Sequence, residues 1–195
     1  MAGTRKFNEE KVLDIAISVF SKKGFNATTM LDLAKETGVQ RGSLYNAYQN
    51  KNVLFFKAFS HYTDKFLMLM EGELQDSDAK KAFTQLFKTI VERLCSDKEL
   101  RGCFSTRAIM EAAQKCPDIN FCLTHFLDGL ELIIKKRLEQ AIKDKQFIGD
   151  AQSAARYLVS LTRGIAVIER AYNDKARMTE IYQTALEYMP FKNAS

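Results

Sequence analysis

Polar side chains that can bind nucleic acid are concentrated between positions 40 and 46. Gln40, Arg41, Ser43 and Asn46 carry groups that hydrogen-bond base edges or phosphates. We expect Arg41 to contact a base, guanine above all, with a phosphate contact as the alternative. Gly42 lies among these residues and has no side chain to keep DNA away from the backbone. The segment therefore predicts a surface that contacts DNA.

The small and apolar residues around this segment predict a helix-turn-helix over residues 29–48. Ala34, Gly38 and Leu44 stand at relative positions i, i+4 and i+10. These positions suit a close helix crossing, a tight turn and an apolar anchor in the second helix, which would enter the major groove. A small core would be closed by Leu31, Val39 and Tyr48. An ordinary helical hairpin with a polar outer face is the alternative.

Helix-breaking residues are scarce, and their positions divide the chain into helices. Its 195 residues include two prolines and nine glycines, and apolar residues recur every three to four positions. We therefore expect an all-α fold of about nine helices without strands. The expected helices cover residues 9–23, 29–38, 41–48, 51–71, 82–94, 101–115, 118–149, 151–172 and 174–189. Residues 1–50 should form the helix-turn-helix domain, and residues 51–195 a regulatory and dimerisation domain.

The helix-turn-helix lies inside a longer string of recognisable features. An apolar helix ends in the pair Gly24-Phe25, and the pair Thr28-Thr29, the turn TGVQRGSLY and the segment YQNKNVL follow. In these features residues 8–56 resemble the N-terminal domain of the tetracycline-repressor (TetR) family of transcriptional regulators. Tyr48 departs from the family's usual phenylalanine, and Gln40 from a serine that would cap the next helix better. The resemblance implies a homodimer that binds a palindromic operator and responds to a small-molecule effector, most often as a repressor.

The resemblance also assigns roles to individual residues. It implies phosphate contacts for Thr29, Tyr45 and Lys51, and it adds Thr28 and Tyr48 to the DNA-binding set. The chemistry of Lys51 agrees, because its ammonium and the N–H groups at the start of a helix would face the same phosphate. For Tyr45 the alternative is a half-buried core residue.

Apolar residues on more than one side of residues 151–172 suggest a second partner surface. One stripe contains Leu158, Leu161 and Ile165, which suffices for packing within one domain. The residues expected at a homodimer interface are Ala155, Val159 and Ala166, with Met178, Tyr182 and Ala185 from the last helix. A two-fold dimer would place its recognition helices about 34–36 Å apart, one DNA turn. A fully buried internal helix is the alternative.

Large apolar residues in the middle of the chain are candidates for an effector pocket. Two polar residues beside them, Arg107 and His125, could orient an anionic or carbonyl group, or could instead lie on the surface or pair with Glu111 or Asp128. The full set of candidates is Tyr62, Phe66, Phe87, Cys103, Phe104, Arg107, Met110, Phe121, His125 and Phe126.

The four cysteines do not predict a metal site. No two of them form a C-x-x-C pair, and Cys122 with His125 lacks further ligands, so we expect neither a metal nor a cofactor. Cys103 follows Arg101-Gly102 near an expected helix start, where a cation and the helix dipole would lower the pKa of its thiol. It is a candidate thiol sensor, since the segment resembles a Gly-Cys branch of the family that includes cysteine-based sensors; an inert buried thiol is the alternative.

The remaining features favour a regulator over an enzyme. The net charge is +5, of which residues 1–56 supply +3 from eight Lys/Arg and five Asp/Glu, a balance that permits nucleic acid binding. Neither histidine forms the Glu-x-x-His pair of a di-iron bundle, and nothing marks a nucleophile. No signal peptide or membrane span is evident, so we expect a cytoplasmic protein. A small-molecule-binding or redox-sensing protein without operator binding is the alternative function.

Overall fold

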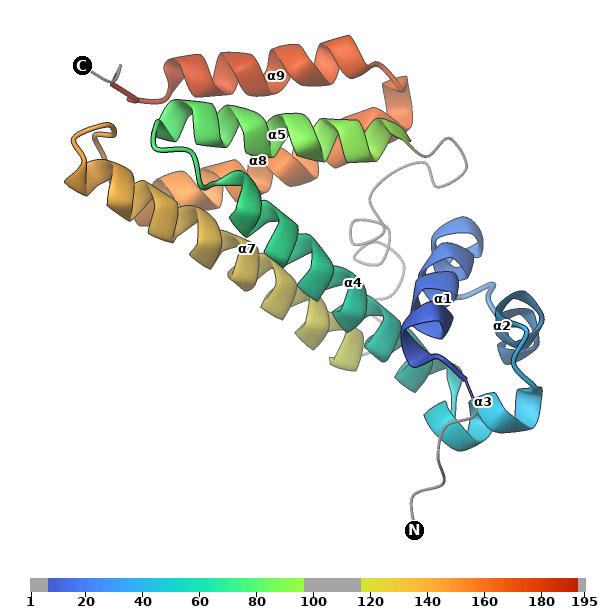
Figure 1. The fold of residues 1–195 in the computed structure, drawn as a ribbon. Helices are drawn as coiled ribbons and strands as arrows, with labels where there is room; N and C mark the ends of the chain where they lie inside the picture. Colours follow the sequence, from blue (N-terminus) through green and yellow to red (C-terminus); the bar gives the residue numbers. More distant parts are fainter. Residues whose placement is uncertain (1–6, 97–116, 193–195) are drawn as a thin grey trace. The chain divides into compact units, whose positions relative to one another are not determined.

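The computed structural model describes residues 7–96 and 117–192, and each regular element in these ranges is a helix (Figure 1). This confirms the predicted all-α fold. The helix expected at 101–115 lies outside the described residues. The helices are α1 (Glu9–Lys23), α2 (Met30–Thr37), α3 (Arg41–Tyr48), α4 (Lys51–Glu73), α5 (Ala79–Ser96), α7 (Pro117–Lys143), α8 (Ala151–Tyr172) and α9 (Lys175–Tyr188).

Side-chain caps fix where several of these helices begin. Asn8 accepts a hydrogen bond from the Lys11 amide at 3.0 Å, Asn50 accepts one from Val53 at 3.0 Å, and Asp174 accepts one from Arg177 at 3.1 Å. Each cap satisfies an amide that has no partner inside its helix. Helices α1, α4 and α9 therefore begin directly after these capping residues.

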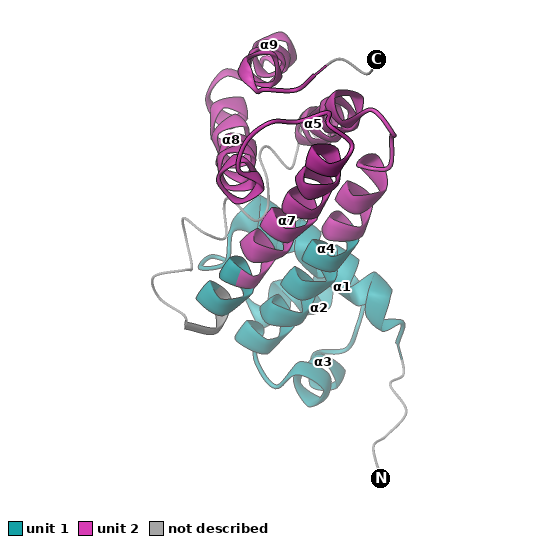
Figure 2. Ribbon diagram, turned by 90° about the vertical axis from the view of Figure 1, so that its left-hand side faces the viewer, with its two compact units in different colours: residues 1–65, 107–124 teal, residues 66–106, 125–195 magenta. Residues whose placement is uncertain are grey.

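The chain divides into two compact units (Figure 2). The described residues of the first unit are 7–65 and 117–124, and those of the second are 66–96 and 125–192. Helices α4 and α7 each contribute residues to both units. The domain boundary expected after residue 50 stays a prediction.

The first unit has an aromatic core between α1 and α4. Phe20 and Phe55 are each 1% exposed, and their ring centroids lie 4.9 Å apart in an edge-to-face arrangement. Phe25, in the turn after α1, packs on Phe55 at 4.9 Å, and Phe59 lies on the other side of Phe55 at 6.0 Å. Since edge-to-face and offset stacking are the favoured geometries of aromatic pairs, this cluster fixes α1 and the following turn against α4.

The second unit contains the other core. Helices α5, α8 and α9 pack together, and the ring of Phe87 stacks on that of Tyr182 at 5.7 Å. Phe66 of α4 contacts Phe126 of α7 edge-to-face at 5.6 Å. A Cβ added at Gly129 would lie 2.9 Å from the Leu67 side chain, so glycine on α7 leaves room for this side chain of α4.

The residues predicted for the dimer interface are buried within the second unit of the single chain, and their role at an interface stays a prediction. Their exposed fractions run from 0% to 8% in the single chain, which leaves little side-chain surface for a partner. Both apolar stripes of α8 contribute buried residues, such as Leu158 and Val159, while Leu161 is half-buried. The residues concerned are Ala155, Val159, Ala166, Met178, Tyr182 and Ala185.

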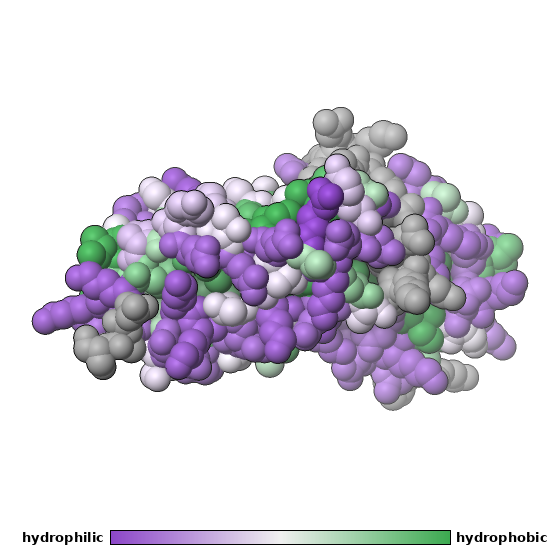
Figure 3. Space-filling model, turned by 90° about the horizontal axis from the view of Figure 1, so that it is seen from above, coloured by the Kyte–Doolittle hydropathy of each residue, from purple (hydrophilic) through white to green (hydrophobic). Residues whose placement is uncertain are grey.

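The outer surface is largely hydrophilic on the face seen in Figure 3, where hydrophobic side chains gather in small separate groups. Scattered apolar residues of this kind are normal on a protein surface. None of the helices within residues 7–96 and 117–192 combines the length and the apolarity that crossing a membrane requires.

Candidate nucleic-acid interface

A capping box fixes the start of α2. The Thr29 hydroxyl accepts a hydrogen bond from the Asp32 amide at 3.1 Å, and the Asp32 carboxylate accepts one from the Thr29 amide at 2.9 Å. The ammonium of Lys23 lies 2.6 Å from the same carboxylate. The hydrogen bond from Lys23, followed by those from Thr29, holds the pKa of Asp32 well below its ordinary value. The end of α1 and the start of α2 are thereby joined.

The turn between α2 and α3 orients the recognition helix. Gly38 has a φ of 67°, the left-handed conformation that glycine adopts without steric cost. Leu44 and Tyr48, one helical turn apart on α3, are both 0% exposed. The opposite side of α3 therefore faces solvent.

The solvent-facing side of α3 carries most of the residues predicted to bind DNA. Gln40, Arg41, Tyr45 and Asn46 are exposed, and Ser43 is half-buried. The helix contains no acidic residue, so no carboxylate on it would repel phosphates. We call the exposed residues Gln40, Arg41, Gly42, Tyr45 and Asn46 the recognition face.

Lys51 holds the turn that precedes α2. Its ammonium donates to the carbonyl of Phe25 at 2.8 Å, contacts that of Asn26 at 3.5 Å, and lies 4.5 Å from the centre of the Phe25 ring. Partial burial lowers the pKa of Lys51. We call this contact the Lys51 clamp. The sequence did not predict it, although the pair Gly24-Phe25 marks the turn involved.

Burial corrects three predictions in this domain. Thr28 is 1% exposed and its hydroxyl donates to the Gly24 carbonyl at 2.7 Å, while Tyr48 is 0% exposed. Neither side chain reaches the surface, so both support the recognition face from within and do not contact DNA. Leu31, expected in the small core, is 64% exposed. The Thr29 hydroxyl is exposed but engaged in the capping box, and its phosphate contact stays a prediction.

A second polar cluster joins α1 to α4 in the same unit. A carboxylate oxygen of Glu10, a carboxylate oxygen of Asp14 and a ring nitrogen of His61 lie within 4.8 Å of one another. The Lys65 ammonium is 2.9 Å from Glu10 and 3.4 Å from Asp14, and these contacts, that with Glu10 foremost, raise the pKa of Lys65. His61 Nε2 is 2.9 Å from Asp14. The cluster is an ion-pair network, and sequence reasoning missed it.

The predicted effector-pocket residues do not share one environment. Phe66, Phe87 and Phe126 are buried in the second unit, where they pack on other side chains. Phe121 is 65% exposed and His125 is exposed, and their assignment to an effector pocket stays a prediction. Tyr62 is half-buried in the first unit. The residues that lie outside the described part are Cys103, Phe104, Arg107 and Met110, and with them the proposed thiol sensor.

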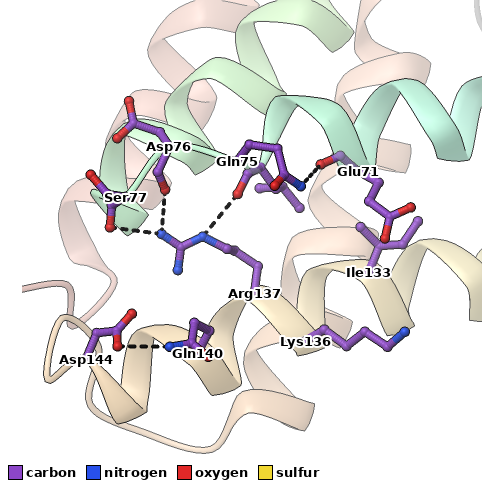
Figure 4. A pocket seen from close by; sticks show the side chains of 10 residues that line it. Glu71, Gln75, Asp76, Ser77, Ile133, Lys136, Arg137, Gln140 and Asp144 are labelled. Atoms are coloured by element: carbon purple, nitrogen blue, oxygen red, sulfur yellow. Dashed lines mark hydrogen bonds between the residues drawn. The ribbon is translucent and has the colours of Figure 1, made fainter.

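A surface pocket of about 370 Å³ lies elsewhere in the second unit (Figure 4). Its walls come from the end of α4, the following turn and α7. Arg137 donates to the carbonyls of Leu74 at 3.1 Å, Asp76 at 2.8 Å and Ser77 at 3.3 Å. The guanidinium thereby binds the segment that connects α4 to α5. None of the predicted pocket residues lines this site.

The two cysteines in the described ranges have little thiol reactivity. Cys122 is 8% exposed. Cys95 is half-buried, and burial, together with the negative charge of Glu169, raises the pKa of its thiol. Because the thiolate is the reactive form, neither residue is a candidate sensor.

This geometry, with a capped first helix, a glycine turn and an exposed polar second helix, defines a helix-turn-helix DNA-binding domain. Residues 12–58 match the family described as bacterial regulatory proteins, tetR family. The HTH-type transcriptional repressor ComR of Escherichia coli (strain K12) is 24% identical over 192 residues, which cover 94% of this chain and 90% of ComR. Residues 12–58 thus carry the DNA-binding domain of the tetR family of bacterial regulatory proteins.

Solved structures share the fold. The reduced form of Escherichia coli NemR superposes with a TM-score of 0.86 at 14% identity, covering 95% of this chain and 98% of NemR. A cysteine mutant of the TetR family transcriptional regulator CifR, complexed with 26 bp double-strand operator DNA, gives a TM-score of 0.84 at 21% identity. That comparison covers 96% of this chain and 99% of the CifR chain.

The low pKa of Asp32 predicts an acid-sensitive start of α2. In the folded state this pKa lies below its ordinary value of 3.8, so the unfolded chain binds a proton more readily. The stabilisation that the ionised Asp32 carboxylate gives the folded state is present when the pH lies above the ordinary pKa of 3.8, and it is lost as the pH falls below that value. Between about pH 5 and pH 2, the thermal unfolding midpoint should fall further in the wild-type protein than in Asp32→Asn. Asp64→Asn, at an exposed carboxylate of α4, is the control. Equal losses in wild type and Asp32→Asn would contradict the role of the capping box.

Proposed function

We propose that this chain is a homodimeric transcriptional repressor that binds a palindromic operator through the recognition face and is released by a small-molecule or thiol-reactive signal. The observation that carries the proposal is the recognition face itself, which is polar, exposed and without acidic residues on α3. The relatives support it, since ComR is named a repressor and CifR was solved with operator DNA. Such a protein acts in the cytoplasm and regulates without catalysing a reaction.

Gly42 supports direct DNA contact because the fold does not require glycine there. A Cβ built at this position meets no atom within 4 Å, so alanine would fit within the chain. Gly42 is the second residue of α3, and glycine is up to about 0.5–1 kcal/mol less favourable than alanine in a helix. A glycine that weakens α3 and fills no steric need of the chain is explained by a partner that approaches the backbone closely.

Gly42→Ala should therefore separate stability from DNA binding. We expect unchanged or slightly higher thermal stability, because alanine favours the helix, and an affinity for DNA reduced about tenfold or more by collision with the duplex. Fluorescence anisotropy with a duplex from upstream of the protein's own gene measures the affinity, which should also fall steeply with salt. Gly72→Ala is the matched control, since its added Cβ likewise meets nothing within 4 Å. Tight binding by Gly42→Ala would count against close approach at this position.

The dimer that we propose uses the exposed side of α8 in place of the buried residues first expected. Tyr157 is 50% and Val167 46% exposed, and Gly164 lies between them with open space at its Cβ position. These residues, spaced seven and three apart, lie on one side of the helix. Small and apolar residues together allow two copies of α8 to approach closely.

Val167→Arg should disrupt this dimer. A charge placed at the centre of an apolar contact between two copies loses its hydration without gaining a partner. We expect sedimentation velocity to give a dimer for the wild type and mostly monomer for the variant at micromolar concentration. Met68→Arg is the control, because Met68 is 73% exposed and lies on α4, outside this stripe of α8. A monomeric wild type would refute dimerisation, and a dimeric Val167→Arg would refute this interface.

A further inference from the structure

Arg41 and Tyr45 form a cation–π pair on the recognition face. The guanidinium carbon of Arg41 lies 5.4 Å from the centre of the Tyr45 ring, within the range of a cation–π contact. The two residues are four positions apart on α3, which brings their side chains together on one side of the helix. Tyr45 is 38% exposed, so its ring is an accessible platform for the guanidinium.

No other described group holds Arg41 in place. Within residues 7–96 and 117–192 it has neither an ion pair nor a side-chain hydrogen bond, and α3 contributes no carboxylate. The ring of Tyr45 is thus the contact that restricts where the guanidinium points. A contact with the π face of a ring uses none of the guanidinium N–H groups as hydrogen-bond donors to a neighbour, so they stay available to DNA.

We propose that Tyr45 is a positioning residue for sequence recognition: its ring holds Arg41 so that the guanidinium reads one guanine in each operator half-site. This rests on the proposed function, and it gives that site a base specificity. The edge of guanine in the major groove offers O6 and N7, two acceptors that match two N–H donors of arginine. Pre-orientation by the ring reduces the conformational freedom that Arg41 loses on binding.

This role differs from the phosphate contact that the family resemblance implies for Tyr45. A phosphate contact uses the hydroxyl group and would strengthen binding to every sequence alike. Positioning of Arg41 uses the ring and affects the preference for one base. Two substitutions separate these roles: Tyr45→Phe removes the hydroxyl and keeps the ring, whereas Tyr45→Leu removes both.

The test compares base preference among variants. An operator is first selected from a randomised duplex library with the wild-type protein, and affinities are then measured for that duplex and for duplexes changed at single base pairs. We expect the wild type to prefer one guanine per half-site by about tenfold or more. Arg41→Ala should lose this preference, Tyr45→Phe should keep it, and Tyr45→Leu should reduce it severalfold.

The outcomes separate the inference from the function on which it rests. A purely structural effect of Tyr45→Leu would weaken all duplexes equally and leave the ratio between them unchanged, and that result would overturn the inference. Full preference in Tyr45→Leu, or lost preference in Tyr45→Phe, would overturn it as well. If the wild type selects no duplex, the proposed function fails first. Circular dichroism melting of each variant verifies that the proteins compared are folded.

Discussion

The arrangement of the DNA-binding unit depends on the contact of one ammonium group with two backbone carbonyls. Lys51, the first residue of α4, binds the carbonyls of Phe25 and Asn26 and covers the Phe25 ring. Those carbonyls belong to the turn between α1 and α2, so the Lys51 clamp fixes the chain just before the capping box. With α2 fixed, the Gly38 turn sets the direction of α3 and thereby of the recognition face.

The recognition face contrasts with the ion pairs behind it. Lys65 of α4 binds two carboxylates of α1, and Lys23 of α1 binds Asp32 of α2. Arg41 on the recognition face has no carboxylate among the described residues, and Gly42 leaves open space beside it. Charges that stabilise the unit are thus paired within it, while the charge available to DNA is directed by an aromatic ring. A surface that binds DNA needs positive charge that carboxylates of the protein do not neutralise.

Much of the first unit could be predicted from the sequence because its determinants are local. Asn8, Thr29 and Gly38 mark helix ends through interactions with residues a few positions away. The surface that covers each apolar face of α8 could not be predicted, because it depends on residues far away in the sequence. Apolar periodicity on α8 shows that a face is covered but not whether α5, α9 or a second chain covers it. The Lys51 clamp was missed likewise, since it joins residues 25 positions apart or more.

The central claim is that Lys51 acts by ordering the turn before α2 and not solely by contacting phosphate. Amide hydrogen exchange of Lys51→Met in the absence of DNA tests it most directly, because the variant keeps the length of the side chain and removes the ammonium. We predict faster exchange than in the wild type at Asp32 and Leu33, whose amides bind Thr29, together with weaker binding of operator DNA. Unchanged exchange at these amides with weakened DNA binding would contradict the claim and leave Lys51 as a phosphate contact alone.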